Sequence, residues 1–209
     1  MPAYKSFVIA GAGNLGSNIA TQLAKEGFQV TALSRVESDS DTSKLSSNGV
    51  KVHKVNYQDK ASLSEAIKGH EVLINTLGAG SFQGDLHEAL PTLAKEAGTQ
   101  LYVPNDWGVD YSIVLESKHP EIHPFIASKP HVAEKLKGLG LPYLQFFPGV
   151  FGSYVALLLE VDKQARTAKV VGPGTAPFTS TTEKEIGQFV AKAFANLPKS
   201  ELENRGLRV

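Results

Sequence analysis

The sequence predicts an α/β protein built on a doubly wound parallel sheet. Short apolar runs rich in Val, Ile and Leu alternate with segments of helical periodicity, which is typical of a parallel sheet covered by helices. A glycine-rich loop joins the first run to the first helical segment, and the alternation weakens after residue 150. We therefore expect a main domain over residues 1–150 and a small, shortened C-terminal subdomain over residues 151–209 at the edge of the sheet.

The individual elements follow from the same pattern. Strands are predicted wherever apolar and β-branched residues cluster, over 5–10, 28–35, 49–57, 70–78, 99–106 and 141–149. The first helix follows the glycines and ends at Gly27. Other helices are predicted over 59–69, 85–98, 130–140 and 183–197. Asp59 is expected to cap one of these helices and Pro130 to open another. Residues 36–44 are predicted to be a polar loop, and residues 205–209 a last short strand.

Composition excludes several classes of function. The net charge is zero, which gives no general attraction to nucleic acid or to an anionic membrane. Cysteine is absent, so disulfides, thiolate metal sites and cysteine nucleophiles are excluded. The first residues lack the pattern of a signal peptide, and no apolar run approaches the roughly 20 residues that span a bilayer. We expect a soluble protein of the cytoplasm, with the nucleus as an alternative, that binds neither nucleic acid nor membrane.

The glycine loop, residues 11–16, is a G-x-G-x-x-G in the setting of a Rossmann-type dinucleotide site, because a strand precedes it and a helix follows it. Gly11 would allow the tight turn, Gly13 would let the backbone approach a diphosphate, and Gly16 would let helix and strand pack closely. Asn14 and Leu15 begin the helix, whose free N–H groups favour an anion. The alternative is a glycine-rich turn without a ligand.

The end of the second strand favours NADP(H) over NAD(H). An NAD site usually has an acidic residue there, whereas this chain has Ser34-Arg35. A guanidinium can bind a 2′-phosphate through two hydrogen bonds, and Lys44 would add a second positive charge. Alternatively, Arg35 and Lys44 are ordinary surface residues.

Later strand ends extend the predicted cofactor track, because ligands lie beyond the carboxyl ends of the strands in such sheets. Asn56-Tyr57 ends the third strand, where the adenine is expected, and Asn56 is the predicted contact. Leu77-Gly78 ends the fourth strand, where small residues would let the chain pass close to a ribose or the nicotinamide. The alternative for these glycine-rich positions is loop geometry alone.

Candidates for chemistry are few. No tyrosine is followed four residues later by lysine, so the usual Tyr-x-x-x-Lys dyad of short-chain dehydrogenases is absent, as is a G-x-S-x-G elbow. His119 and His123 have metal-like spacing, but prolines interrupt the helix that they would need, and no metal is expected. Lys129 stands at the start of a predicted helix, where the helix dipole and partial burial would lower an ammonium's pKa. It is the candidate acid–base or a ligand of the nicotinamide ribose; otherwise it is a surface lysine.

The ordered set of these segments resembles the NmrA-like and isoflavone-reductase-like group of atypical short-chain dehydrogenases. The matching pieces are the glycine loop, Arg35, Lys44, "GVKVHKVNYQD", "LYVPNDWG", "FIASKPHVAEKL" and "YLQFFPGVFGSYV", over about residues 5–209. The resemblance implies an NADP(H)-binding fold, a lysine at position 129 that assists proton transfer, and Pro148 among the cofactor contacts. The chain departs from the family's pattern in three ways: Asn105 replaces a common serine, Pro130 follows Lys129, and the chain is shorter than the family's usual length. The resemblance therefore implies cofactor binding more directly than catalysis.

Two functions follow. The first is an NADPH-dependent reductase of a small carbonyl, enone or aromatic compound, with Lys129 as acid–base. Trp107, Phe147 and Phe151 would form apolar walls, although these aromatics could equally be core. The second is a redox sensor or regulatory protein that binds NADP(H) without turnover. A homodimer or a regulatory protein partner is also considered for this protein. An NAD-dependent sugar-nucleotide enzyme is disfavoured by Arg35 and by the missing dyad.

Overall fold

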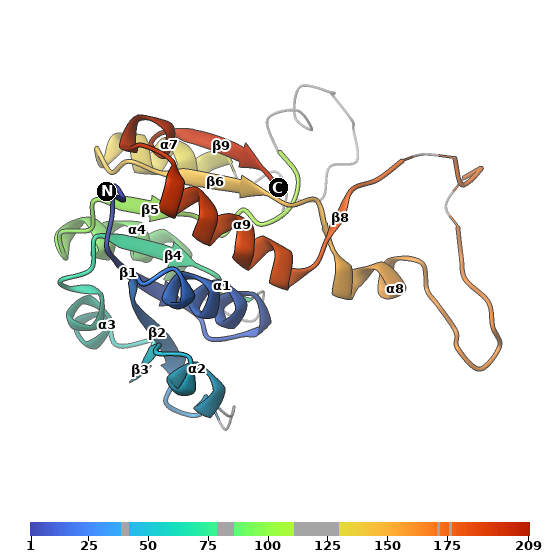
Figure 1. Ribbon diagram of the computed structural model, residues 1–209, viewed down its shortest axis with the longest axis horizontal. Coiled ribbons are helices and arrows are strands. Elements are labelled where there is room, and N and C mark those ends of the chain that lie inside the picture. Colours follow the sequence, from blue (N-terminus) through green and yellow to red (C-terminus); the bar gives the residue numbers. More distant parts are fainter. Residues whose placement is uncertain (39–41, 79–85, 111–129, 171, 176) are drawn as a thin grey trace.

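The computed structural model describes residues 1–38, 42–78, 86–110, 130–170, 172–175 and 177–209. Within these residues, five parallel strands form the central sheet in the order β3-β2-β1-β4-β5 (Figure 1). Their bounds are β1 Ser6–Ala10, β2 Gln29–Arg35, β3 Lys51–Val55, β4 Val72–Asn75 and β5 Leu101–Val103. The predicted parallel sheet is therefore confirmed.

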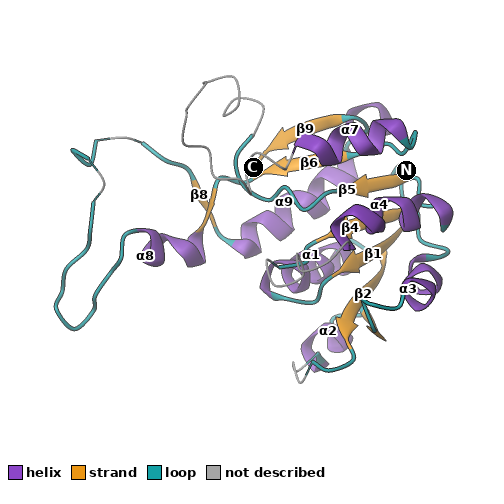
Figure 2. Ribbon diagram, turned by 180° about the vertical axis from the view of Figure 1, so that it is seen from behind, coloured by secondary structure: helices purple, strands orange, loops and turns teal. Residues whose placement is uncertain are grey.

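Helices cover both faces of this sheet, as a doubly wound fold requires. One face carries α1 (Asn14–Lys25), α2 (Ser43–Ser47) and α9 (Glu183–Asn196), as seen in Figure 1. The other face carries α3 (Lys60–Ile67), α4 (Leu86–Glu96) and α7 (Pro130–Gly138), which lie in front in Figure 2.

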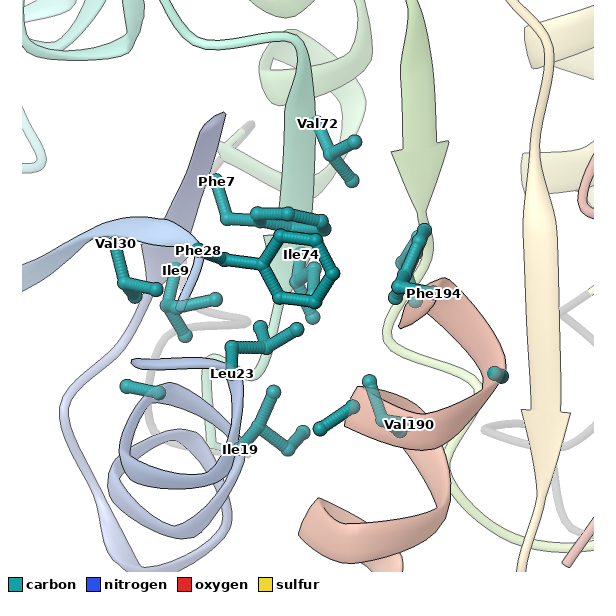
Figure 3. Close-up of a cluster of buried hydrophobic side chains, with 14 of the residues drawn as sticks. Phe7, Ile9, Ile19, Leu23, Phe28, Val30, Val72, Ile74, Val190 and Phe194 are labelled. Carbon is teal, nitrogen blue, oxygen red and sulfur yellow. The ribbon is translucent and has the colours of Figure 1, made fainter. Parts of the chain in front are cut away.

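Side-chain alternation along the strands divides the core into two layers. Phe7 and Ile9 of β1 face α1 and α9, whereas Val8 and Ala10 face the opposite helices. Figure 3 shows the first layer, in which side chains from β1, β2 and β4 meet those of α1 and α9. Because both faces of β1 and β4 are buried, these two central strands are nearly continuous apolar runs in the sequence, whereas the edge strand β3 is largely exposed and carries Lys and His.

Local signals place the helix ends where the sequence predicts them. The Asp59 carboxylate accepts hydrogen bonds from the N–H groups of Ala61 and Ser62 and so caps α3. Gly27 follows α1 with φ of +86°, in the left-handed region that favours glycine. The helix α7 begins at Pro130, as expected.

One local prediction is wrong. Residues 36–44 do not form a loop throughout, because α2 begins at Ser43 and takes in Lys44. Leu45 is the buried residue of this five-residue helix, and its polar neighbours are exposed. A helix with one apolar contact has too little periodicity to be seen in a sequence.

The sixth predicted strand, β6 (Leu144–Phe147), continues the sheet only loosely. Tyr143, the residue before β6, forms an isolated bridge with Tyr102 of β5, and β6 itself pairs along its length with β9 (Arg205–Arg208). That pairing is parallel. In Figure 1, β9 lies on the side of β6 that faces away from β5, at the edge of the fold.

Residues after 150 divide between the core and a projecting segment. Val190 and Phe194 of α9 pack in the same layer as α1 and β1. In contrast, η2 (Gly152–Tyr154), α8 (Val155–Leu158) and residues 159–170 extend away from the sheet in Figures 1 and 2. We call residues 155–170 the arm. The division of the chain at residue 150 stays a prediction.

Candidate functional site

The glycine loop turns sharply between β1 and α1. Gly11 has φ of +106°, which favours glycine. A Cβ on Gly16 would lie 2.0 Å from the carbonyl oxygen of Gly11 and 2.5 Å from Thr76 Oγ1, so no side chain fits there. A Cβ on Gly13 would meet no atom within 4 Å. The loop is therefore closed against the sheet at Gly16 and open at Gly13, which is the geometry that a phosphate-binding loop needs.

Thr76 holds this loop in place from the end of β4. Its hydroxyl lies 3.1 Å from the carbonyl oxygen of Ala10 and 2.9 Å from that of Gly11, and can donate to either. Its backbone N–H donates to Ala10 as well. Thr76 was not predicted from the sequence as a site residue. The available signal was a polar residue directly after the apolar strand that pairs with β1.

A cavity of about 280 Å³ lies beside the loop. It occupies the carboxyl ends of β1, β2 and β4, where the strand order reverses between β1 and β4. Such switch points are where open α/β sheets bind ligands. Among the described residues, its lining consists of Gly11, Ala12, Gly13, Leu33, Ser34, Arg35, Ser38, Tyr57, Thr76, Leu77 and Gly78.

Six of the thirteen predicted cofactor residues come together at this cavity. Gly11, Gly13, Ser34, Arg35, Leu77 and Gly78 all line the cavity. Asn14, Leu15 and Gly16 form the start of α1 behind it, with Leu15 and Gly16 buried. The Asn14 side chain donates to Glu183 in α9, with 3.1 Å between nitrogen and oxygen.

A second cation near the cavity comes from β3 and not from α2. Lys44 is exposed on α2 and does not line the cavity. Lys54 Nζ donates to the carbonyl oxygens of Arg35, at 3.3 Å, and Ser38, at 2.8 Å. The Lys54 ammonium therefore holds the turn after β2. It was missed because the register of β3 against β2, which pairs Ser34 with Lys54, is not visible in the sequence.

Tyr57 is the aromatic wall of the cavity. Its hydroxyl donates to the carbonyl oxygen of Leu33 at 3.1 Å. Burial raises the pKa of Tyr57, while the Gly11 backbone amide and the Arg35 charge pull that pKa partly back. Asn56, the predicted contact, instead accepts the Gln58 N–H in a turn before α3 and lies outside the lining.

A buried polar network stands at the ends of β4 and β5. Asn75 donates to the Tyr102 hydroxyl at 3.2 Å and accepts from the Leu77 N–H at 3.1 Å. Trp107 Nε1 donates to the Asn75 carbonyl oxygen at 2.8 Å, and its ring stacks on Phe146 with 5.5 Å between centroids. The Trp107 ring is therefore held between the end of β4 and Phe146 of β6.

Another cavity, of about 470 Å³, opens at the carboxyl ends of β6 and β9. Phe147 and Phe178 contribute aromatic walls, and Arg208 and Asp110 form an ion pair of 3.5 Å at its rim. Trp107 and Phe151 do not line it. The three predicted apolar walls therefore do not converge on one described cavity.

The two remaining predicted cofactor residues are Lys129 and Pro148. Lys129 lies outside the residues that the structure describes. Pro148 is buried, and its carbonyl oxygen accepts from Thr181 Oγ1 at 2.8 Å. Among the described residues, His, Asp and Glu side chains form no cluster suited to a metal ion. None of the helices in the described parts of the chain is long and apolar enough to cross a bilayer.

The strand order, the glycine loop and the cavity at the switch point define a Rossmann-type α/β protein. The chain belongs to the NmrA-like family, whose model matches residues 5–208.

Its relatives include reductases. It is 29% identical over 210 residues to oxidoreductase BOA1 of Botryotinia fuckeliana, covering 93% of this chain and 67% of that protein. It is 28% identical over 211 residues to the isoflavone reductase homolog IRL of Zea mays, covering 94% and 66%. A solved structure of AtPrR2 with NADP⁺ and (+)pinoresinol has the same fold, with a TM-score of 0.76 and 18% identity over 100% of this chain and 70% of that one. The chain spans about two thirds of the length of these relatives.

Proposed function

We propose that this protein binds NADP(H) in the 280 Å³ cavity and acts as an NADPH-dependent oxidoreductase on a small carbonyl, enone or aromatic compound. One observation carries the proposal: the open side of the glycine loop and the Arg35 guanidinium line the same cavity. An anion-binding loop and a cation beside the same cavity are what a phosphorylated dinucleotide requires.

The residues present fit such a cofactor. The open space at Gly13 admits a diphosphate against the backbone N–H groups at the start of α1. Thr76 fixes the two carbonyl oxygens behind the loop, so these acceptors are turned away from the anion. The loop is therefore preorganised for an anion.

Arg35 and Ser34 would bind the 2′-phosphate at the end of β2. Lys54 adds positive charge at the same turn while it holds the carbonyl oxygens of Arg35 and Ser38. Tyr57 offers a flat face to the adenine, and Leu77-Gly78 passes close to the more distant half of the cofactor. An acidic residue in the place of Arg35 would repel the extra phosphate.

When bound, the reduced nicotinamide supplies a hydride to the substrate. Lys129 is the proposed proton donor, on the basis of its place before α7 in the sequence. Trp107, Phe147 and Phe151 are the proposed apolar walls. The relatives named oxidoreductase and isoflavone reductase homolog support the reaction class.

A binding experiment tests the cofactor. Titration calorimetry of the wild-type chain should show NADPH binding more tightly than NADH. Arg35→Glu should raise the dissociation constant of NADPH about 30-fold more than that of NADH, since a charged hydrogen bond of about 2 kcal/mol is lost. Lys51→Glu is the matched control, because Lys51 is exposed at the opposite end of β3 and pairs with Thr31. Equal losses for both dinucleotides would contradict the assignment.

A turnover experiment separates the reductase from the sensor. The chain is mixed with NADPH and a panel of quinones, enones and aromatic carbonyls, and the absorbance of the reduced nicotinamide is followed. Consumption that disappears in Lys129→Ala supports a reductase with that acid–base. Tight NADPH binding without consumption would support the sensor instead.

A further inference from the structure

Glu183 is a buried carboxylate with two side-chain donors. It stands in the first turn of α9 and is 8% exposed. Its Oε1 accepts from Asn14 Nδ2 at 3.1 Å and from the Ser153 hydroxyl. Burying a carboxylate is costly unless hydrogen bonds replace the lost water, so these two donors compensate a large desolvation cost.

Asn14 is held by this contact at the start of the glycine-loop helix. Its amide nitrogen is engaged by Glu183, and its amide oxygen accepts from Asn18 Nδ2 at 3.2 Å. Asn18 also donates to the Asn14 carbonyl oxygen at 2.9 Å. Both ends of the Asn14 amide are therefore used, and the side chain is kept on the α9 side, away from the cavity lining.

Ser153 brings the second partner from a different part of the chain. It lies in η2, directly after β7 (Val150–Phe151), which pairs with β8 (Ser180–Thr181). This segment contains Phe151, a proposed apolar wall. Glu183 therefore joins the helix that begins at the glycine loop to the segment that directly follows β7.

The helices α1 and α9 hold Glu183 in register. A Cβ on Gly187 would lie 2.8 Å from the Asn18 carbonyl oxygen, so the two helices touch through backbone one turn beyond Glu183. Ile186 and Val190 bury the same helix face against α1. The close packing of α1 against α9 therefore holds the Glu183 carboxylate next to Asn14. In such a packed contact, a small movement of one helix moves the other.

We propose that Glu183 is a positioning residue that couples NADP(H) binding at the glycine loop to the placement of the segment 150–154. The inference rests on the proposed function, because it assumes that the cofactor sits on the loop. Glu183 acts through Asn14, which sets the first turn of α1, and through Ser153, which sets the segment beside Phe151. Removal of the carboxylate frees the Asn14 amide and loosens both ends of this link.

Three variants test the role. Glu183→Ala should weaken NADPH binding about tenfold, because hydrogen bonds to a buried charged group are lost next to the loop. Glu183→Gln should stay within about threefold of wild type, since its amide oxygen can accept from both donors. Glu185→Ala is the matched control: Glu185 lies in the same turn and caps α9 with Thr182, but it does not contact Asn14. It should lower the thermal midpoint and leave the dissociation constant unchanged.

A double-mutant cycle measures the coupling itself. Ser153→Ala should weaken NADPH binding in the wild-type background and have no effect in Glu183→Ala, because the path between Ser153 and Asn14 is then already broken. Additive effects would overturn the coupling.

The remaining outcomes are also decisive. The role of Glu183 is refuted if Glu183→Ala binds NADPH within twofold of wild type, or if Glu185→Ala weakens binding as much. Failure of the proposed function has a different signature: wild type would not bind NADPH, or Arg35→Glu would bind it unchanged.

Discussion

At the scale of single residues, the site depends on two positions that are constrained for different reasons. Gly16 is fixed by contact, since an added Cβ would overlap the Gly11 carbonyl oxygen. Thr76 is fixed by hydrogen bonding, since its hydroxyl engages the carbonyls of Ala10 and Gly11. The glycine motif was visible in the sequence, but the hydrogen bonds by which Thr76 holds the glycine loop from the end of β4 were not.

Gly16→Ala should lower the free energy of unfolding by about 1–3 kcal/mol, the usual cost of overpacking, and should weaken NADPH binding. The measurements are urea unfolding and calorimetry. Gly138→Ala is the control, because a Cβ at that position of α7 meets nothing within 4 Å. It should leave stability unchanged or raise it by up to about 1 kcal/mol. Similar losses in both variants would contradict the contact argument.

Tyr57 makes stability depend on pH in a defined direction. Burial raises its pKa above the usual value of about 10, so the unfolded chain releases this proton before the folded chain does. Its contribution is complete below pH 10 and is lost as pH rises further. Unfolding free energy should therefore fall above pH 10, and Tyr57→Phe should flatten that fall.

Urea unfolding between pH 9 and pH 11 checks this expectation. Tyr102→Phe should flatten the fall as well, because burial also raises the pKa of Tyr102. Slopes parallel to the wild-type slope in both variants would show that neither hydroxyl is responsible.

At the scale of elements, the last long helix completes the first core layer. The Phe194 ring of α9 lies 4.9 Å from Phe7, 6.3 Å from Tyr4 and 6.4 Å from Phe146, measured between centroids. The amphipathic pattern of α9 predicted a helix from the sequence, just as the patterns of the first strands and helices predicted those elements. The pattern could not say that the apolar face would cover β1, because periodicity identifies a buried face but not its partner.

Phe194→Ala should destabilise the protein by about 3–5 kcal/mol, as expected for a fully buried aromatic that leaves a cavity. Phe178→Ala should change the free energy of unfolding by less than about 0.5 kcal/mol, since Phe178 is 59% exposed. Denaturant midpoints of the two variants give the comparison. A small loss for Phe194→Ala would mean that α9 is not part of the cooperative core.

At the scale of the whole molecule, the chain consists of a packed body and the projecting arm. Large apolar side chains in and next to the arm are exposed, including Leu157 at 68% and Leu158 at 58%. These side chains add little to the stability of the single chain, whereas the body holds both core layers.

Replacing Leu157 and Leu158 together by Ser should therefore shift the unfolding free energy by less than about 0.5 kcal/mol. Urea unfolding at two protein concentrations measures this. A loss above 1 kcal/mol that grows with protein concentration would show that another copy of the chain covers the α8 face.

Local features of the sequence were enough to predict the parallel sheet, the order of its elements, the glycine loop and Arg35, because periodicity, caps and glycine requirements act over a few residues. Only the tertiary structure decided that Tyr57 and Thr76 line the same cavity, that Lys54 holds the turn after β2, and that β9 pairs with β6. It also brought Asn14 to Glu183, which lie 169 residues apart. Contacts between residues far apart in the sequence depend on strand register and helix packing. Register and packing are determined by the complete core and not by any local segment.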